Sequence, residues 1–92
     1  MNYKPLKESF SKKGFTYSLL KREGDKAIYE QKMGNKLLAY EVIRVRRHDG
    51  YTIAGVFMEP SETYPSDNDW GTFGWTYNKL EQAKTKYESL NE

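Results

Sequence analysis

The sequence predicts an α+β fold, in which a four-stranded antiparallel β-meander is packed on one face by a C-terminal α-helix. Three observations support this class. Short stretches of alternating apolar and polar residues recur between residues 15 and 58, as in half-buried strands. Pairs of Gly with Asp or Asn separate these stretches and supply the positive φ angles of tight hairpins. Residues 76–90 place apolar side chains three and four positions apart, the period of an amphipathic helix.

The chain has the length of one domain with a thin core. It contains 92 residues, of which 37% are hydrophobic and 30% charged, so we expect one layer packed on another. Aromatic residues, at 15%, must supply much of the buried area. We assign residues 1–13 to an N-terminal arm or short helix, 14–58 to the meander, 59–75 to an aromatic and acidic loop, and 76–90 to the helix.

Residues 1–13 have two alternative interpretations. Pro5 suits the first position of a helix, and Leu6 and Phe10 share one helical face. A Gly after two lysines is typical of a helix end. These features predict a short helix of about eight residues. The alternative is an extended arm that runs to Phe15.

Three turn signals divide the first half of the chain. They are Gly24-Asp25, Gly34-Asn35 and Asp49-Gly50, and each follows a stretch rich in β-branched or aromatic residues. A fourth strand is expected over residues 51–58, after which Pro60 begins a loop. The four strands in this order predict the meander.

The C-terminal helix is predicted from one apolar stripe. Its members are Leu80, Ala83, Tyr87 and Leu90, and we expect this stripe to pack on one sheet face. Thr76 is one candidate for the residue that caps its start. An alternative start at Asn78, with Glu81 three residues later, forms a capping box.

The third strand decides which residues lie under the helix. We expect Ala39, Ile43 and Val45 to face the helix, because side chains alternate between the two faces of a strand. The opposite, open face then carries Tyr40, Val42, Arg44 and Arg46. A shift of one residue in register would reverse this assignment.

The charge is unevenly distributed. Residues 1–47 hold twelve Lys and Arg against five Asp and Glu, whereas residues 48–92 hold three against eight. Such asymmetry is typical of a nucleic-acid-binding surface, or of two halves that attract each other in the fold. Guanidinium groups bind phosphate and aromatic rings stack on bases. The nucleic-acid interpretation therefore uses the candidate residues Arg22, Lys32, Tyr40, Arg44 and Arg46. Its alternative is a solvated sheet face that blocks edge pairing.

The loop at residues 59–75 is the most distinctive stretch. It combines indole rings next to glycines with a run of acidic residues, and glycine permits sharp turns and close approach of rings. One interpretation is a small second core. The other is an exposed aromatic platform that anchors a protein partner. The candidate partner-binding residues are Tyr64, Asp67, Asp69, Trp70, Phe73 and Trp75.

This loop, together with residues 21–25 and 40–47, resembles small uncharacterised proteins encoded by bacteriophages and prophages. The likeness covers residues 14–90 and implies a mobile-element setting without an established activity. The order of four strands and a helix is also similar to that of the whirly and transcriptional-coactivator proteins. That second likeness concerns element order alone, so it implies no functional residues.

The sequence contains no motif for catalysis or for a cofactor. It has no Cys, which excludes disulfides and thiol chemistry. His48 is the single imidazole, beside an expected hairpin turn, and Asp67-Asn68-Asp69 lacks the later ligands of a calcium loop. We therefore expect no enzyme, no cofactor and no metal site.

These observations predict a small binding protein of phage or prophage type in the cytoplasm of a bacterial host. We expect it to bind a host or phage macromolecule, for example as an inhibitor of a host system. The alternative is a protein that binds single-stranded DNA or RNA. No apolar run reaches the length of a membrane span. Either a monomer or a homodimer paired through sheet edges fits the sequence.

Overall fold

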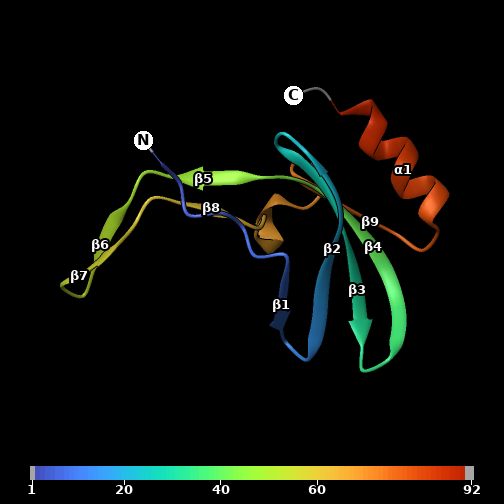
Figure 1. Ribbon diagram of the computed structural model, residues 1–92, viewed down its shortest axis with the longest axis horizontal. Helices are drawn as coiled ribbons and strands as arrows, with labels where there is room; N and C mark the ends of the chain where they lie inside the picture. The colour runs from blue at the N-terminus through green and yellow to red at the C-terminus, as the bar shows by residue number, and fades with distance from the viewer. Residues whose placement is uncertain (1, 91–92) are drawn as a thin grey trace.

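The computed structural model describes residues 2–90 and confirms the α+β class. Its main sheet is antiparallel with the strand order β1-β2-β3-β4-β9, and the single helix α1 packs on it (Figure 1). The sheet consists of β1 (Ser9–Lys12), β2 (Phe15–Glu23), β3 (Lys26–Met33), β4 (Lys36–Arg44) and β9 (Gly74–Tyr77), and α1 spans Leu80–Ser89. The remaining elements are β5 (Arg46–His48), β6 (Tyr51–Ile53), β7 (Val56–Met58), β8 (Ser61–Thr63) and the short 3-10 helix η1 (Asp67–Asp69).

The three central strands form as predicted. The hairpins β2–β3 and β3–β4 turn at Gly24 and Gly34, whose φ angles are 58° and 59°. These positive values are accessible to glycine without the steric cost that a Cβ atom imposes. The Gly-Asp and Gly-Asn signals therefore place the turns correctly.

The N-terminal helix prediction is wrong. Residues 9–12 form strand β1, which pairs with β2 in the register Phe10↔Tyr17. The Phe10 ring stacks on the Tyr17 ring with 5.0 Å between the centroids. Leu6 and Phe10 both pack against the core cluster of the sheet, so their apolar character reflects sheet packing and not a helical stripe. The extended alternative describes the segment better.

The predicted fourth strand at residues 51–58 is also wrong. This stretch folds back on itself as the hairpin β6–β7, which turns at Ala54 and Gly55 with φ angles of 50° and 80°. Two successive positive φ angles characterise the type I′ turn of two-residue hairpins. The position beside β4 is taken by β9, in the register Val42↔Trp75.

Helix α1 begins four residues later than expected. Thr76 and Tyr77 belong to β9 and pair with β4, so their backbone groups are not available for a helix. Three of the four residues of the predicted stripe, Ala83, Tyr87 and Leu90, are buried against the sheet, whereas Leu80 is half-buried. The ammonium group of Lys26 donates to the backbone carbonyls of Tyr87 and Leu90 at 3.2 and 3.4 Å, where a cation stabilises the helix C-terminus.

The sheet has apolar clusters on both faces, and the predicted face assignment is reversed. Val42 lies under the helix with Ile28, Ala83 and Tyr87. Ile43 and Val45 lie on the other face with Tyr17, Ala27 and Tyr29, covered by Leu6, Phe10, Tyr64 and Trp70. The alternation along β4 was predicted correctly. Both of its faces are apolar, however, so the pattern could not determine which face the helix covers.

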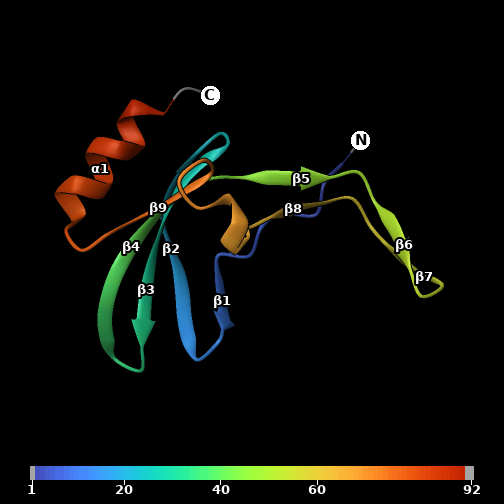
Figure 2. The same cartoon turned by 180° about the vertical axis from the view of Figure 1, so that it is seen from behind.

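A long arm leaves the sheet where β4 ends. Its base is the pair β5–β8 and its tip is the pair β6–β7 (Figures 1 and 2). The N-terminal segment adds to the base through a parallel bridge between Lys4 and Ser61. The arm gives the molecule extents of 43 × 32 × 21 Å.

Candidate protein-binding arm

The tip of the arm carries an apolar patch on one of its faces. Residues that lie directly opposite each other in a hairpin share a face, and the register pairs Tyr51 with Met58 and Ile53 with Val56. These four side chains are 43%, 43%, 59% and 60% exposed, in that order. We call them the tip patch. Large side chains in adjoining positions that stay this open are unusual for a folded chain and mark interaction surfaces.

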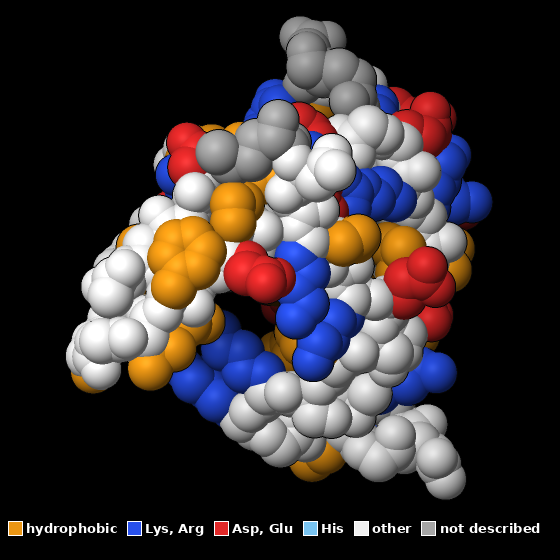
Figure 3. Space-filling view, turned by 60° about the vertical axis from the view of Figure 1, so that its left-hand side comes forward, with side chains coloured by type: hydrophobic (Ala, Val, Ile, Leu, Met, Phe, Trp, Pro, Cys, Tyr) orange, Lys and Arg blue, Asp and Glu red, His pale blue; other side chains and the backbone are white. Residues whose placement is uncertain are grey.

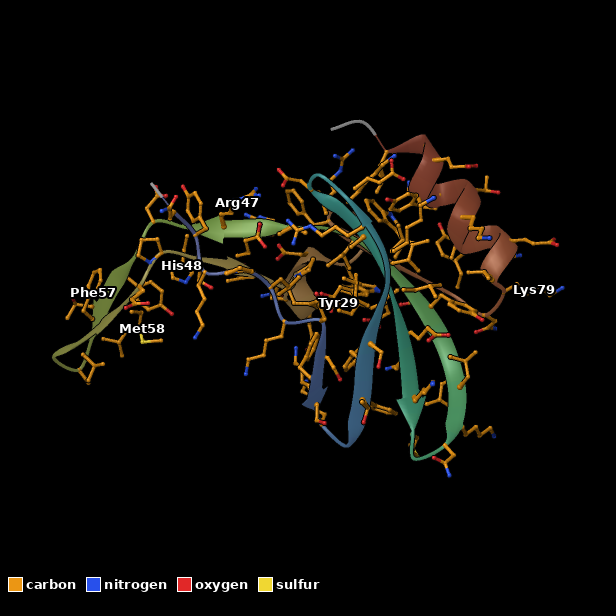
Figure 4. All side chains as sticks on the ribbon, in the orientation of Figure 1. Tyr29, Arg47, His48, Phe57, Met58 and Lys79 are labelled. Carbon is orange, nitrogen blue, oxygen red and sulfur yellow. The ribbon has the colours of Figure 1, made fainter. Side chains whose placement is uncertain are left out.

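The opposite face of the tip carries Phe57, the most exposed of the large hydrophobic residues at 62%. Figure 4 shows Phe57 and Met58 pointing to opposite sides of the ribbon. Gly50 lies under the Phe57 ring, where a Cβ atom would come within 3.0 Å of the ring. In Figure 3, which turns the arm toward the viewer, hydrophobic side chains are open on the part of the surface that comes forward.

The base of the arm is fixed to the sheet by charged hydrogen bonds. The Arg22 guanidinium donates to both carboxylate oxygens of Glu62, at 2.8 and 2.7 Å. Arg47 donates to the same carboxylate at 3.0 Å and to both oxygens of Asp25 in the β2–β3 turn at 2.8 and 2.5 Å. Paired bonds between guanidinium and carboxylate groups fix orientation as well as distance. This charged cluster therefore sets the direction of the arm.

The pKa values in the cluster follow from these contacts. The hydrogen bonds from Arg22 lower the pKa of Glu62 from its ordinary value of 4.5 to about 2, and the Leu6 amide, 3.0 Å away, also lowers it. The hydrogen bonds from Arg47 lower the pKa of Asp25. The hydrogen bond to Asp25 raises the pKa of Arg47. All of these groups are consequently charged at neutral pH.

The N-terminal segment supports the base, and its Lys4 also lines a pocket with Met58 of the tip patch. Tyr3 donates its hydroxyl proton to Asp49 at 2.5 Å, and its ring lies near the Arg47 guanidinium. The Lys4 amide donates to Pro60, and the Lys4 carbonyl accepts from the Glu62 amide, both at 2.9 Å. Within residues 2–90, the strands β6 and β7 pair with each other and with no other strand. A two-stranded ribbon of this kind has marginal stability in water.

The tip segment itself is acidic, and Lys4 of the N-terminal segment lies beside it, lining a pocket with Phe57, Met58 and Glu59. Residues 49–60 include Asp49 and Glu59 and no Lys or Arg. His48, at the end of β5, accepts a hydrogen bond from the Gly50 amide at 3.2 Å and contacts the Tyr51 ring. Its position is a bend within the arm and not the predicted hairpin tip. The imidazole therefore shapes the path of the chain.

The two tryptophans of the predicted partner-binding platform are separated by the sheet. Trp70 packs on the face away from the helix, and Trp75 packs on the helix face. Both side chains are half-buried. The Trp70 indole N–H donates to the Thr76 hydroxyl at 2.9 Å, and the Lys86 ammonium lies 4.2 Å from the Trp75 ring centroid. The expected continuous platform of both indoles is therefore wrong.

The other residues of that prediction have individual contacts. Tyr64 lies in the aromatic cluster and donates to Glu41 at 2.6 Å. Asp67 is exposed and pairs with Lys13 at 3.2 Å. Asp69 and Phe73 both contact Arg46: the carboxylate is 3.1 Å from the guanidinium, and the Phe73 ring centroid is 4.0 Å from its central carbon. These contacts favour the small second core.

The predicted nucleic-acid residues do not form one surface. Arg22 is on the sheet face away from the helix and is paired with Glu62. Tyr40 and Arg44 alternate with Ile43 and so share the helix face, where Tyr40 packs against the helix cluster. Arg46 lies beyond the sheet, in the arm. The open arginine-rich face that the prediction required is therefore absent from residues 2–90.

The tip patch was missed from the sequence. The alternating pattern of residues 51–58 predicts a single strand, the fourth of the meander. Gly55 was the available signal, because an isolated glycine in a strand pattern marks a bend or turn. The residue before Gly55 is alanine, whereas Asn-Gly and Asp-Gly are the usual residue pairs in two-residue hairpin turns. The turn was therefore not predicted.

Comparison with known proteins yields no relative. The chain matches no family model, and no curated protein or solved structure shows significant similarity. Within residues 2–90, no helix is long and apolar enough to cross a membrane. The same residues contain no group of three or more His, Cys, Asp or Glu that could hold a metal ion.

Proposed function

We propose that this chain is a non-enzymatic binding protein that attaches to another protein through the tip of its arm. The observation that carries the proposal is the tip patch, in which Tyr51, Ile53, Val56 and Met58 share one face and are 43–60% exposed. Clusters of apolar and aromatic side chains supply most of the binding energy at protein interfaces. Covering the patch would also stabilise a hairpin that has little support of its own.

The charge near the patch favours a protein over nucleic acid. A nucleic-acid surface needs Lys or Arg to neutralise phosphates, and residues 49–60 contain none. Asp49 and Glu59 repel a polyanion and also an anionic membrane surface. The partner surface that fits is an apolar groove with a basic rim. Single-stranded DNA or RNA remains the alternative, with a weaker basis, because its candidate residues lie on different surfaces.

The ion pairs at the base of the arm are consistent with an arm that presents the tip patch to a partner. Arg22, Glu62, Arg47 and Asp25 hold the arm in one direction relative to the sheet, and a fixed direction reduces the entropy lost on binding. The setting we propose is that of a small phage or prophage protein acting on a host or phage macromolecule, for example by blocking a host system. This setting rests on the sequence resemblance alone.

The test compares two matched double variants. Ile53→Asp/Val56→Asp places two charges in the tip patch. Met33→Asp/Leu37→Asp places two charges at other exposed apolar positions, which are 53% and 40% exposed in the native chain. Tagged versions of all three proteins are used for affinity capture from the natural host, and captured proteins are then purified and titrated by calorimetry.

The proposal predicts a partner that binds the native chain and the Met33/Leu37 variant equally in purified form. Charges in the tip patch should weaken that binding by at least tenfold, since two hot-spot contacts at about 1–2 kcal/mol each are lost. Equal binding by all three proteins would contradict the proposal. Sedimentation measures whether the native chain forms a dimer. A dimer that dissociates in the Ile53→Asp/Val56→Asp variant would show that the tip patch mediates self-association, and the proposal would be wrong.

A further inference from the structure

A cavity of about 260 Å³ lies on the sheet face away from the helix. Four of its lining residues are aromatic: Phe10, Tyr17, Tyr64 and Trp70. None of its lining residues belongs to the tip patch, so the cavity is a second and separate feature. Its volume is below the range of about 300–1,000 Å³ for drug-sized ligands and suits a group of the size of one side chain.

Two ring pairs form the aromatic walls. Phe10 and Tyr17 are stacked with 5.0 Å between centroids and 16° between planes. Tyr64 and Trp70 are stacked at 6.3 Å and 29°, and Tyr17 and Tyr64 are 5.9 Å apart. The faces of these rings carry partial negative charge and their edges partial positive charge, so a cation in the space is attracted by the faces.

The buried charged group at the cavity is the carboxyl of Glu41, which shares the lining with the polar residues Lys12, Gln31 and Asp67. Glu41 is 7% exposed, and it is the one buried charged residue in the described part of the chain. One of its oxygens accepts the hydroxyl proton of Tyr64 at 2.6 Å. No Lys or Arg within residues 2–90 forms an ion pair with it. A buried carboxylate without a cationic partner is costly.

The electrostatics favour a positively charged occupant. Burial raises the pKa of Glu41, and burial together with the nearby Glu41 raises the pKa of Tyr64. Burial is the largest cause of both shifts, and the charge of the exposed Lys12 opposes it by lowering the pKa of Glu41. At the mouth, the exposed residues Lys12 and Asp67 carry opposite charges. Water screens these two, whereas the charge inside the cavity is screened much less.

We propose that the cavity binds an organic cation, an ammonium or guanidinium group held between the aromatic rings and the Glu41 carboxylate. Two sources supply this chemistry: a free small molecule, or the Lys or Arg side chain of a peptide. Three of the residues that the sequence singled out for partner binding, Tyr64, Asp67 and Trp70, line this cavity. They meet here as walls of a pocket and not as an exposed platform.

The test is an NMR titration that follows the Trp70 indole N–H, assigned by comparison with a Trp75→Phe variant. The probes are ethylguanidinium, tetramethylammonium, a blocked Gly-Arg-Gly peptide and the neutral isostere ethylurea. The proposal predicts saturable shifts with a dissociation constant of about 1 mM or lower for at least one cation, and at least tenfold weaker binding of ethylurea. Tighter binding of the peptide than of ethylguanidinium identifies a protein side chain as the source, and the reverse identifies a small molecule.

Two variants test the assigned groups. Glu41→Gln keeps the shape of the side chain and removes its charge, so the affinity for cations should fall at least tenfold. Glu30→Gln, on the helix face of β3, is the control and should leave the affinity unchanged. Phe10→Leu keeps Glu41 and removes one ring, and it should weaken binding severalfold even if Glu41→Gln folds poorly. Absence of saturation by every cation, equal binding of ethylurea, or unchanged affinity in both Glu41→Gln and Phe10→Leu would overturn the proposal.

Discussion

Arg22 and Glu62 join the sheet to the arm across 40 positions of sequence. The guanidinium donates to one carboxylate oxygen at 2.8 Å and to the other at 2.7 Å, and the Glu62 side chain is only 10% exposed. The pair lies at the root of an arm whose tip displays apolar side chains to solvent. This contact between β2 and β8 therefore joins the base of the arm to the sheet.

Replacing Glu62 should reveal this contact in the pH dependence of stability. Its pKa is lowered to about 2, so its contribution is complete above the ordinary pKa of 4.5 and is lost as the pH falls from 4.5 toward 2. Glu62→Gln should lower the free energy of unfolding at neutral pH by about 2 kcal/mol. This value is smaller than the free energy that corresponds to the full pKa shift of Glu62, because the partner arginines are partly exposed and water screens their charge.

Denaturant titrations at several pH values measure this effect, with the exposed Glu59→Gln as the control. The Glu62→Gln curve should be flatter than the native curve between pH 4.5 and 2, with some slope left from Asp25, whose pKa is also lowered. Parallel curves for the two variants would show that the ion pairs of Glu62 contribute nothing to stability.

The tip turn should respond in opposite directions to two substitutions at Ala54. Its φ angle of 50° is one that Asn adopts readily and a β-branched residue does not. Ala54→Asn should therefore stabilise the hairpin by several tenths of a kcal/mol, and Ala54→Val should destabilise it by about 1 kcal/mol or more. Amide hydrogen exchange of residues 51–58 should slow in the first variant and accelerate in the second. Identical exchange in both would refute the type I′ turn.

Gly74 should tolerate no side chain while Trp70 is present. A Cβ atom at this position would lie 2.5 Å from the Trp70 ring, and Gly74 is in strand β9, so the ring cannot move aside without leaving the core. Gly74→Ala should cost about 1–3 kcal/mol of stability. In a Trp70→Leu background the same change should cost much less. A double-mutant cycle by chemical denaturation measures the coupling, and additive effects would argue against the close approach.

Tyr87 should be the most costly position in the helix. Its ring is 1% exposed, its hydroxyl donates to Glu23 at 3.1 Å, and the Lys26 ammonium lies 4.5 Å from the ring centroid. Tyr87→Ala should lower stability by about 3–5 kcal/mol, enough to unfold a marginal domain. The neighbouring exposed Lys84→Ala serves as the control and should melt like the native chain. Cooperative native-like melting of Tyr87→Ala would mean that the helix does not cover the sheet.

The elements that local chemistry determines could be predicted from the sequence. Gly24 and Gly34 set the central hairpins, and the spacing of Ala83, Tyr87 and Leu90 sets the helix face. Strand β9 could not be predicted, because Gly74–Tyr77 joins the sheet through pairing with β4, which is distant in sequence. Which face of the sheet the helix covers also depends on long-range contacts.

The candidate site was harder to predict for a related reason. An exposed apolar hairpin and a buried strand have the same alternating pattern, and only the turn at Ala54-Gly55 distinguishes them. The aromatic loop places its rings on both faces of the sheet. Its contacts with Glu41 and Phe10 depend on the register of distant strands.

Photo-crosslinking from the arm tests the central claim most directly. A benzoylphenylalanine residue is placed at Phe57 on the arm or, as a control, at the exposed Lys79 beside the helix, far from the arm (Figure 4). In the natural host, position 57 should crosslink to one distinct protein, and position 79 should not. The crosslink should disappear in the Ile53→Asp/Val56→Asp background and persist in Met33→Asp/Leu37→Asp. The same products from both positions, or a crosslink at position 57 that survives charges in the tip patch, would contradict a protein-binding arm.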